Sequence, residues 1–270
     1  MRLPFAMFLW FLPALILSAE ARPPTLAEIR TAIAEYQSGA VYALPALEAD
    51  QLEALLDGEV VRFVDKPAGG MGVRRATGLM LTDVARARMW LACQDAHFTG
   101  DPSVHELRLA LRPPDDATWF GLVDVPAPFS DRRWVVRSWN NHALAATTAG
   151  RAWEHPWENA PADPRRLRAR VLAGDVPGVT AEMFDNAVET PVNHGAFLAV
   201  TLPGGQTLFG YHATFDPGGG LSDWLVARWA HAGLEKGFRR YEARARDVIP
   251  SHHGAGHVPV YGGDGRPVAP

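Results

Sequence analysis

Side chains able to take part in acid–base chemistry gather in the stretch DVPAPFSDRRW, which ends at Trp134. Ser130 and Asp131 stand beside Arg132 and Arg133, but no histidine lies near in the sequence to activate the serine. The simpler interpretation is a corner between two strands. In such a corner Asp131 accepts hydrogen bonds from loop amides and pairs with an arginine. The residues alone favour this structural role of Asp131 and Arg132 over catalysis.

Histidines are the next candidates, because clustered imidazoles bind Zn²⁺ or Cu²⁺. His252, His253 and His257 lie close together in the sequence, in a segment with few carboxylates. His194 and His212 become neighbours if their two strands form a hairpin, yet no third ligand accompanies them. We therefore expect no metal site, although the first cluster keeps the possibility open.

Sequence signatures of common catalytic and cofactor sites are missing. The chain has no G-x-S-x-G, H-E-x-x-H, G-x-x-x-x-G-K or C-x-x-C pattern. The glycines of GGMG, 69–72, precede a strand rather than a helix, which is typical of a turn. Cys93 is the only cysteine and lies in an apolar stretch, so we expect a buried, unreactive thiol and no disulfide. No cofactor is expected.

Composition describes a single globular domain with tails. The chain has 270 residues, of which 47% are hydrophobic and 21% charged, enough apolar material for a core. Its net charge of −4 argues against nucleic acid as a partner. Nine tryptophans are present, all but Trp10 after residue 30. Tryptophan suits both cores and ligand pockets.

The first 21 residues have the pattern of an export signal. Arg2 precedes the apolar run Phe5–Leu17, and Ala19-Glu20-Ala21 is a small-x-small cleavage site. The run is shorter than the roughly 20 residues that span a bilayer. We expect cleavage after Ala21 and a periplasmic or secreted protein, with an uncleaved membrane anchor as the alternative.

Periodicity places helices and strands in the first part of the chain. A helix is expected over 23–39, where Thr25 and Glu28 form a capping box, and a short helix is expected to end at Gly58. Runs rich in β-branched residues predict strands at 59–66 and 71–82, and a helix follows over 84–98.

The second part of the chain is predicted to be mostly strands and one long helix. A disordered tail, 247–270, is expected to follow the helix at 221–246. The stretch 155–193 resists assignment and is expected to be loop with one further strand. Strands are expected at 104–112, 117–125, 132–144, 151–157, 194–203 and 206–216, and the last two should form a hairpin. This order predicts an α+β fold in which the long helix covers a curved sheet.

Alternation along two strands suggests a partly polar inward face. Arg133 and Arg137 mark one face of their strand as solvated, so Trp134 should point inward. An apolar face with a few hydroxyls suits either a cavity for an amphipathic ligand or a solid core, and the residues alone do not decide. The expected ligand-binding residues are Trp134, Val136, Ser138, Phe209, Tyr211, Phe215, Leu225 and Trp229.

Two segments resemble START-type lipid-transfer domains of the helix-grip (SRPBCC) superfamily. They are DVPAPFSDRRWVVRSW, 124–139, and TLFGYHATFDPGGGLSDWLV, 207–226. The resemblance covers residues 25–246. This chain departs from the family pattern at Arg133 and Trp134. Between 140 and 195 the resemblance rests on length alone.

The resemblance implies a helix-grip fold with an apolar cavity under the C-terminal helix and a structural Asp131-Arg132 corner. It implies an exported, bacterial-type protein that binds or transfers a lipid or another hydrophobic small molecule. Such a protein is expected to be a monomer that contacts membrane surfaces transiently. The alternative is a cyclase- or hydrolase-like enzyme on the same fold, for which His142, His212 and Arg137 are the candidate ionisable groups.

Overall fold

The structure is a computed structural model that describes residues 22–67, 73–94, 103–221, 223–247 and 259–269; at 223–227, 229 and 230 it describes the backbone alone. The predicted export signal and the histidines at 252, 253 and 257 lie outside these ranges. The elements are α1 (Leu26–Gln37), α2 (Ala49–Leu56), β1 (Val61–Asp65), β2 (Arg74–Thr82), α3 (Arg86–Gln94), β3 (Val104–Arg112), β4 (Asp116–Val123), β5 (Arg132–Ser138), α4 (His142–Thr147), β6 (Ala152–Asn159), α5 (Pro164–Leu172), α6 (Ala181–Asn186), β7 (Val188–Glu189), β8 (Val192–Thr201), β9 (Thr207–Asp216) and α7 (Asp223–Asp247).

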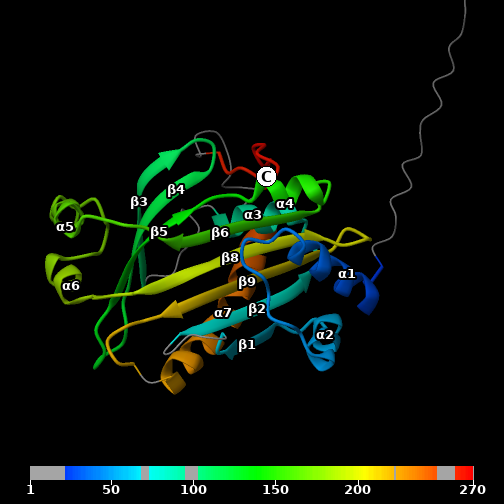
Figure 1. The fold of residues 1–270 in the computed structure, drawn as a ribbon, viewed down its shortest axis with the longest axis horizontal. Helices are drawn as coiled ribbons and strands as arrows, with labels where there is room; N and C mark the ends of the chain where they lie inside the picture. Colours follow the sequence, from blue (N-terminus) through cyan, green and yellow to red (C-terminus); the bar gives the residue numbers. More distant parts are fainter. Residues whose placement is uncertain (1–21, 68–72, 95–102, 222, 248–258, 270) are drawn as a thin grey trace, which may run out of the picture.

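One nine-stranded sheet forms the centre of the molecule (Figure 1). Its strand order is β1-β2-β9-β8-β6-β5-β4-β3, and β7 pairs with β5 in parallel, whereas the other pairs are antiparallel. The predicted hairpin of β8 and β9 is confirmed, with Val192 opposite Asp216 and Thr201 opposite Thr207. The pairing of β2 with β9, Thr82 opposite Thr207, brings early and late parts of the chain together.

Helices α1 and α2 cover one face of the sheet, which we call the outer face. The predicted capping box starts α1, since Thr25 accepts from the Glu28 amide and the Glu28 carboxylate accepts from the Thr25 amide. Buried Ile29 and Tyr36 of α1 and Leu55 of α2 belong to one apolar cluster with side chains of β2, β8 and β9. The outer face is therefore buried at this end of the sheet.

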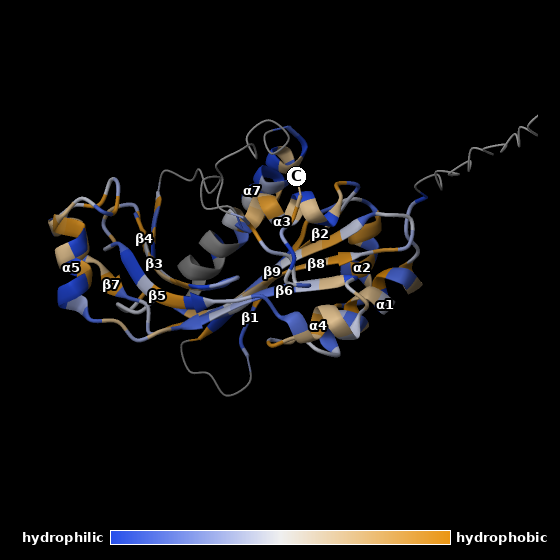
Figure 2. Cartoon of the chain, turned by 90° about the horizontal axis from the view of Figure 1, so that it is seen from above, coloured by the Kyte–Doolittle hydropathy of each residue, from blue (hydrophilic) through white to orange (hydrophobic). Residues whose placement is uncertain are grey.

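Helices α3 and α7 cover the other face, which we call the cavity face. Figure 2 shows both helices on the side of the sheet opposite to α1 and α4. Phe238 of α7 packs edge-on against Phe209 of β9, with ring centroids 5.4 Å apart. It also lies directly over Gly78, where a Cβ atom would come within 2.4 Å of the ring. Glycine at this position lets α7 approach β2 closely.

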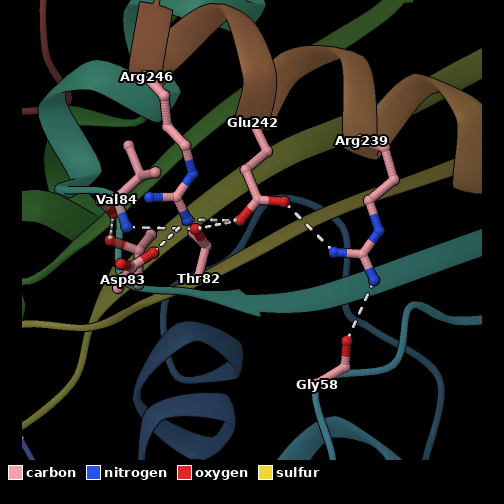
Figure 3. Close-up of polar contacts among 8 residues, drawn as sticks. Gly58, Thr82, Asp83, Val84, Arg239, Glu242 and Arg246 are labelled. Atoms are coloured by element: carbon pink, nitrogen blue, oxygen red, sulfur yellow. Dashed lines mark hydrogen bonds and ion pairs between the residues drawn. The ribbon is translucent and has the colours of Figure 1, made fainter.

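Polar contacts fasten the C-terminal half of α7 to the edge of the sheet (Figure 3). Glu242 accepts a hydrogen bond of 2.7 Å from the Thr82 hydroxyl, and Arg246 pairs with both Glu242 and Asp83. Arg239 donates to the carbonyl of Gly58, which follows α2. These contacts fix the half of α7 that lies over β1 and β2.

Two stretches differ from the sequence-based prediction because polar side chains cap helices there. The strand predicted over 132–144 ends at Ser138, and Asn141 caps α4 by accepting from the Leu144 amide at 3.0 Å. The stretch expected to be loop contains α5, capped by Asp163, and α6, capped by Thr180. These two helices cover the outer face of β4 and β5, so the prediction that the arginine-bearing face is solvated is wrong near Arg133. The Arg133 guanidinium lies 4.3 Å from the Phe184 ring centroid of α6.

The C-terminal segment 259–269 is packed against the domain, and the prediction of a disordered tail is wrong for it. The Tyr261 carbonyl accepts hydrogen bonds from Trp90 Nε1 at 3.0 Å and Asn140 Nδ2 at 2.8 Å. Gly262 and Gly263 are buried against Trp153, where Cβ atoms would collide with the indole. Because these two residues have no side chains, the backbone at Tyr261 comes close enough to accept the hydrogen bonds from Trp90 and Asn140.

Among the described residues, no helix has the length and apolar character needed to cross a membrane. Within the same part of the chain, no three His, Cys, Asp or Glu side chains are grouped so that they could hold a metal ion.

Candidate functional site

A cavity of about 260 Å³ lies between the cavity face of the sheet and the helices α3 and α7. Strands β3, β4, β5, β6, β8 and β9 contribute residues to its wall. The lining residues are Cys93, Gln94, Glu106, Trp119, Trp134, Val136, Ser138, His155, Trp157, Asn193, Phe197, Tyr211 and Tyr241.

Four of the eight residues predicted to bind a ligand line this cavity: Trp134, Val136, Ser138 and Tyr211. Alternation along β5 puts the first three on one face, as expected from the pleat of a strand. Phe209 is fully buried in the core under α7, and Phe215 packs against the same apolar cluster as Trp134 without lining the cavity. The side chains of Leu225 and Trp229 lie outside the described part of α7.

Aromatic rings form the apolar wall. Trp157 and Tyr211 are stacked with centroids 5.4 Å apart, and Phe197 lies 5.0 Å from Tyr211. Two glycines make room for the indoles. A Cβ atom on Gly121 would lie 2.3 Å from the Trp134 ring, and one on Gly195 would lie 2.8 Å from the Trp157 ring.

A second cavity, of about 450 Å³, adjoins the first and is lined in part by the C-terminal residues 259–261. The two cavities adjoin because they share lining residues. The shared residues are Gln94, Glu106, Trp119, Ser138 and His155.

Ionisable groups in the first cavity are shifted toward their uncharged forms by desolvation. Burial raises the pKa of the Cys93 thiol and of the Tyr211 hydroxyl, each to about 12, and lowers the pKa of His155 to about 3. Glu106 is exposed, and desolvation by the surrounding protein raises the pKa of its carboxyl. Desolvation therefore keeps the Cys93, Tyr211 and His155 side chains uncharged near neutral pH.

Sequence reasoning missed His155 and Trp157, and a signal for both was present. Trp153, His155 and Trp157 alternate along β6, so they share one face, and two tryptophans on it indicate an inward direction. Tyr241 of α7 also lines the cavity and was not predicted to do so.

The ionisable residues considered for an enzyme lie away from the first cavity. His212 is buried on the outer face, where its Nε2 lies 3.0 Å from the Tyr36 hydroxyl. Arg137 pairs with Asp116 at 2.9 Å, and His142 contacts the Gly263 carbonyl at 2.7 Å. None of these three residues lines either cavity.

The Asp131-Arg132 corner connects strands and does not touch the cavities. Asp131 accepts a hydrogen bond of 3.0 Å from the Val125 amide across the corner. Arg132 is 6% exposed and donates to the carbonyls of Pro217 and Gly218, at 2.6 and 3.2 Å. Its guanidinium thus ties β5 to the turn that precedes α7.

The arrangement of an antiparallel sheet gripping a long C-terminal helix over a cavity defines a helix-grip fold of the α+β class. The sheet is open, because its two edge strands, β1 and β3, do not pair.

Comparison with solved structures identifies this as the START-type fold. A STAR-related lipid transfer protein fragment from Xanthomonas axonopodis aligns with a TM-score of 0.51 and 16% identity, covering 75% of this chain and 97% of that one. Human STARD10 aligns with a TM-score of 0.50 and 13% identity, covering 80% and 87% of the two chains. An aromatase/cyclase from Streptomyces aligns less well, with a TM-score of 0.42 and 13% identity, covering 65% of this chain and 98% of that one.

No protein-family model matches the sequence, and no curated protein matches it either. The comparisons therefore establish the fold alone.

Proposed function

We propose that this protein binds a hydrophobic or amphipathic small molecule, such as a lipid, in the cavity between the sheet and α3 and α7. The observation that carries the proposal is the aromatic cavity itself. Its wall of Trp119, Trp134, Trp157, Phe197 and Tyr211 offers apolar surface with a few polar groups, which is the usual make-up of a small-molecule site.

The size of the cavities limits the ligand. A water-sized group occupies about 30 Å³, so the first cavity, at 260 Å³, holds roughly nine such groups. Burying a methylene contributes about 0.8 kcal/mol, so nine give about 7 kcal/mol before the cost of association is subtracted. Tight binding therefore requires a ligand that extends into the second cavity. A single alkyl chain or a small ring system fits this space better than a two-chain phospholipid.

Binding is favoured over the alternative of a hydrolase-like enzyme because the nucleophiles in the cavity are not activated. The Cys93 thiol has a raised pKa and bonds the Trp90 carbonyl. The Ser138 hydroxyl has no hydrogen-bond partner, so His155 does not polarise it. A carrier requires neither group to react.

The test is isothermal titration calorimetry with dodecanol and dodecanoic acid on the wild type and on Val136→Trp. Val136 is 7% exposed and lines the first cavity, so an indole there fills the space that the ligand needs. Val41→Trp is the matched control, because Val41 is 44% exposed and distant from both cavities. We expect binding by the wild type and the control, and at least a tenfold weaker Kd for Val136→Trp, about 1.4 kcal/mol. No binding by the folded wild type, or equal binding by both variants, contradicts the proposal.

Export is proposed as well, with Arg2, the apolar run Phe5–Leu17 and Ala19-Glu20-Ala21 as its support. N-terminal sequencing of the protein from culture medium or envelope should begin at Arg22. A mature chain that retains Met1 would contradict this.

A further inference from the structure

The region where the two cavities meet is their most polar part. Gln94, Glu106, Ser138 and His155 line both cavities there, beside the ring of Trp119. A ligand that extends from one cavity into the other passes these groups. Their hydrogen-bonding states therefore determine which polar group a ligand can carry at this point.

The Ser138 hydroxyl is buried without a partner. Ser138 is 4% exposed, and its Oγ makes no hydrogen bond although it lies in the wall of both cavities. Leaving a buried hydroxyl unpaired is unfavourable, and native proteins mostly avoid it. A ligand group that bonds Oγ removes this penalty, so the position is suited to a polar atom of a ligand.

The Nε2 atom of the neighbouring His155 can only accept a hydrogen bond. Asn140 donates through Nδ2 to the carbonyls of Tyr261 and Gly262, at 2.8 and 3.3 Å, which leaves its Oδ1 facing His155. The distance from Oδ1 to His155 Nδ1 is 2.8 Å, and Oδ1 is an acceptor, so Nδ1 carries the hydrogen. The ring is neutral because burial lowers its pKa to about 3. Nε2 therefore bears a lone pair, and no described residue donates to it.

Ser138 and His155 are diagonal neighbours on the cavity face of the sheet. In the β5–β6 pair Ser138 lies opposite Trp157, and His155 is two residues further along the same face of β6. The Cβ atoms of such neighbours are roughly 7 Å apart, and side chains at this separation can reach toward each other, so a polar group of the ligand between them can contact both.

Charge at this position disfavours an anion. Among the described residues that line both cavities there is no lysine or arginine, and Glu106 contributes the only carboxyl. Arg108 lines the second cavity only, with its guanidinium 5.8 Å from the Trp119 ring centroid. His155 stays neutral at physiological pH, so it does not attract a carboxylate or phosphate either. An acceptor-only group, such as an ether or a carboxylate, would leave Nε2 without a donor.

We propose that the cavity selects a ligand with an uncharged hydroxyl group, which donates a hydrogen bond to His155 Nε2 and accepts one from Ser138 Oγ. The inference rests on the proposed function and deepens it. It assigns the ligand to the class of neutral amphipathic alcohols, a long-chain or alicyclic alcohol, rather than to fatty acids or phospholipids.

The test compares three probes that share one alkyl chain: dodecanol, dodecyl methyl ether and dodecanoate. Binding is followed at pH 7.5 by calorimetry and by the fluorescence of the tryptophans in the cavity wall. We expect dodecanol to bind the wild type about tenfold more tightly than the ether, and dodecanoate to bind most weakly. Dodecanoate binding as tightly as dodecanol would overturn the proposal.

Ser138→Ala isolates the polar contact, since it removes an unpartnered group and should leave the fold intact. We expect it to weaken dodecanol binding about fivefold to tenfold, with no loss of thermal stability. Thr77→Val is the matched control. Thr77 is also fully buried with an unpartnered hydroxyl, but it points to the outer face opposite His212. Thr77→Val should leave the affinity unchanged.

The outcomes separate this inference from the proposed function. Equal affinities for all three probes, unchanged by Ser138→Ala, would overturn the hydroxyl site and leave a carrier of apolar chains. Failure of all three probes to bind the folded wild type would overturn both. Preference for dodecanol that is lost in Ser138→Ala and kept in Thr77→Val supports the inference.

Discussion

Replacing Glu154 by alanine should destabilise the protein strongly, although the residue lies far from the cavity. Glu154 is 0% exposed on the outer side of β6. Its carboxylate accepts hydrogen bonds from the Val41 amide at 2.9 Å, the Tyr36 hydroxyl at 2.8 Å and Asn141 Nδ2 at 2.6 Å. One side chain thus joins the α1–α2 connection, α1 and the cap of α4 to the sheet.

The size of the effect follows from the donors left behind. Each buried donor without an acceptor costs about 1–3 kcal/mol. Glu154→Ala leaves the Val41 amide and one hydrogen of Asn141 Nδ2 without an acceptor, and it removes one of the partners of the Tyr36 hydroxyl, which keeps the Tyr42 carbonyl and His212 Nε2 within reach. Water entering the vacated space satisfies part of this need, so we expect a loss of about 3–5 kcal/mol in the free energy of unfolding. Typical domains have about 5–15 kcal/mol in total, so the variant should be close to unfolding.

Urea denaturation at pH 7, followed by circular dichroism, measures the loss. Glu158→Ala is the control on the same strand, because its side chain is 46% exposed and its contact with Arg137 is 3.7 Å. We expect the control to lose less than about 1 kcal/mol. Tyr36→Phe removes one donor and should lose an intermediate amount. If Glu154→Ala is as stable as Glu158→Ala, the network does not hold the outer layer and the reasoning is wrong.

Three further predictions concern the tail, pH and the thiol. Deleting residues 259–270 should lower the Tm by about 5 °C, because Trp90 and Asn140 lose their acceptors; an unchanged Tm in a calorimetric scan would show that the docked segment adds nothing. Stability should fall as pH drops from 6.5 toward 4, since the unfolded chain protonates histidine at about 6.5 whereas the pKa values of folded His155 and His212 are about 3 and 4. Each histidine contributes a slope of up to about 1.4 kcal/mol per pH unit to the free energy of unfolding. The variant His212→Gln should have a smaller slope. A free energy of unfolding that does not change with pH would contradict the burial of neutral imidazoles. Cys93, with its pKa raised to about 12, should resist iodoacetamide at pH 8 in the folded state and react in urea; rapid labelling of the folded protein would show an accessible thiolate.

The fold class could be predicted from sequence because its strongest signals are local. The hairpin of β8 and β9 turns at Gly204 and Gly205, which both have positive φ angles of 95° and 88°, a conformation that glycine adopts readily. The start of α1 follows from Thr25 and Glu28, which bond each other's backbone. Such features depend on a few adjacent residues, so no knowledge of the distant chain is required.

The tail and the polar junction of the cavities could not be predicted because they depend on contacts between distant residues. Gly262 and Gly263 suggest disorder in isolation, and only the ring of Trp153 gives them a surface to pack on. Similarly, the hydrogen on His155 is placed by Asn140, whose own orientation is set by the Tyr261 carbonyl. Strand parity identifies which side of β6 carries His155, but not the chain of bonds that fixes its state.

The pairing of β2 with β9 also dictates when a ligand can enter. During synthesis β2 leaves the ribosome long before β9. The edge of β2 that pairs with β9 stays unpaired until the segment Thr207–Asp216 has been made. The wall of the cavity includes Tyr211 of β9 and Tyr241 of α7, so the binding space does not exist on a partly synthesised chain. A ligand cannot act as a template around which the first strands assemble. A ligand of this cavity has to enter a finished domain, so loading can only follow synthesis of the whole domain.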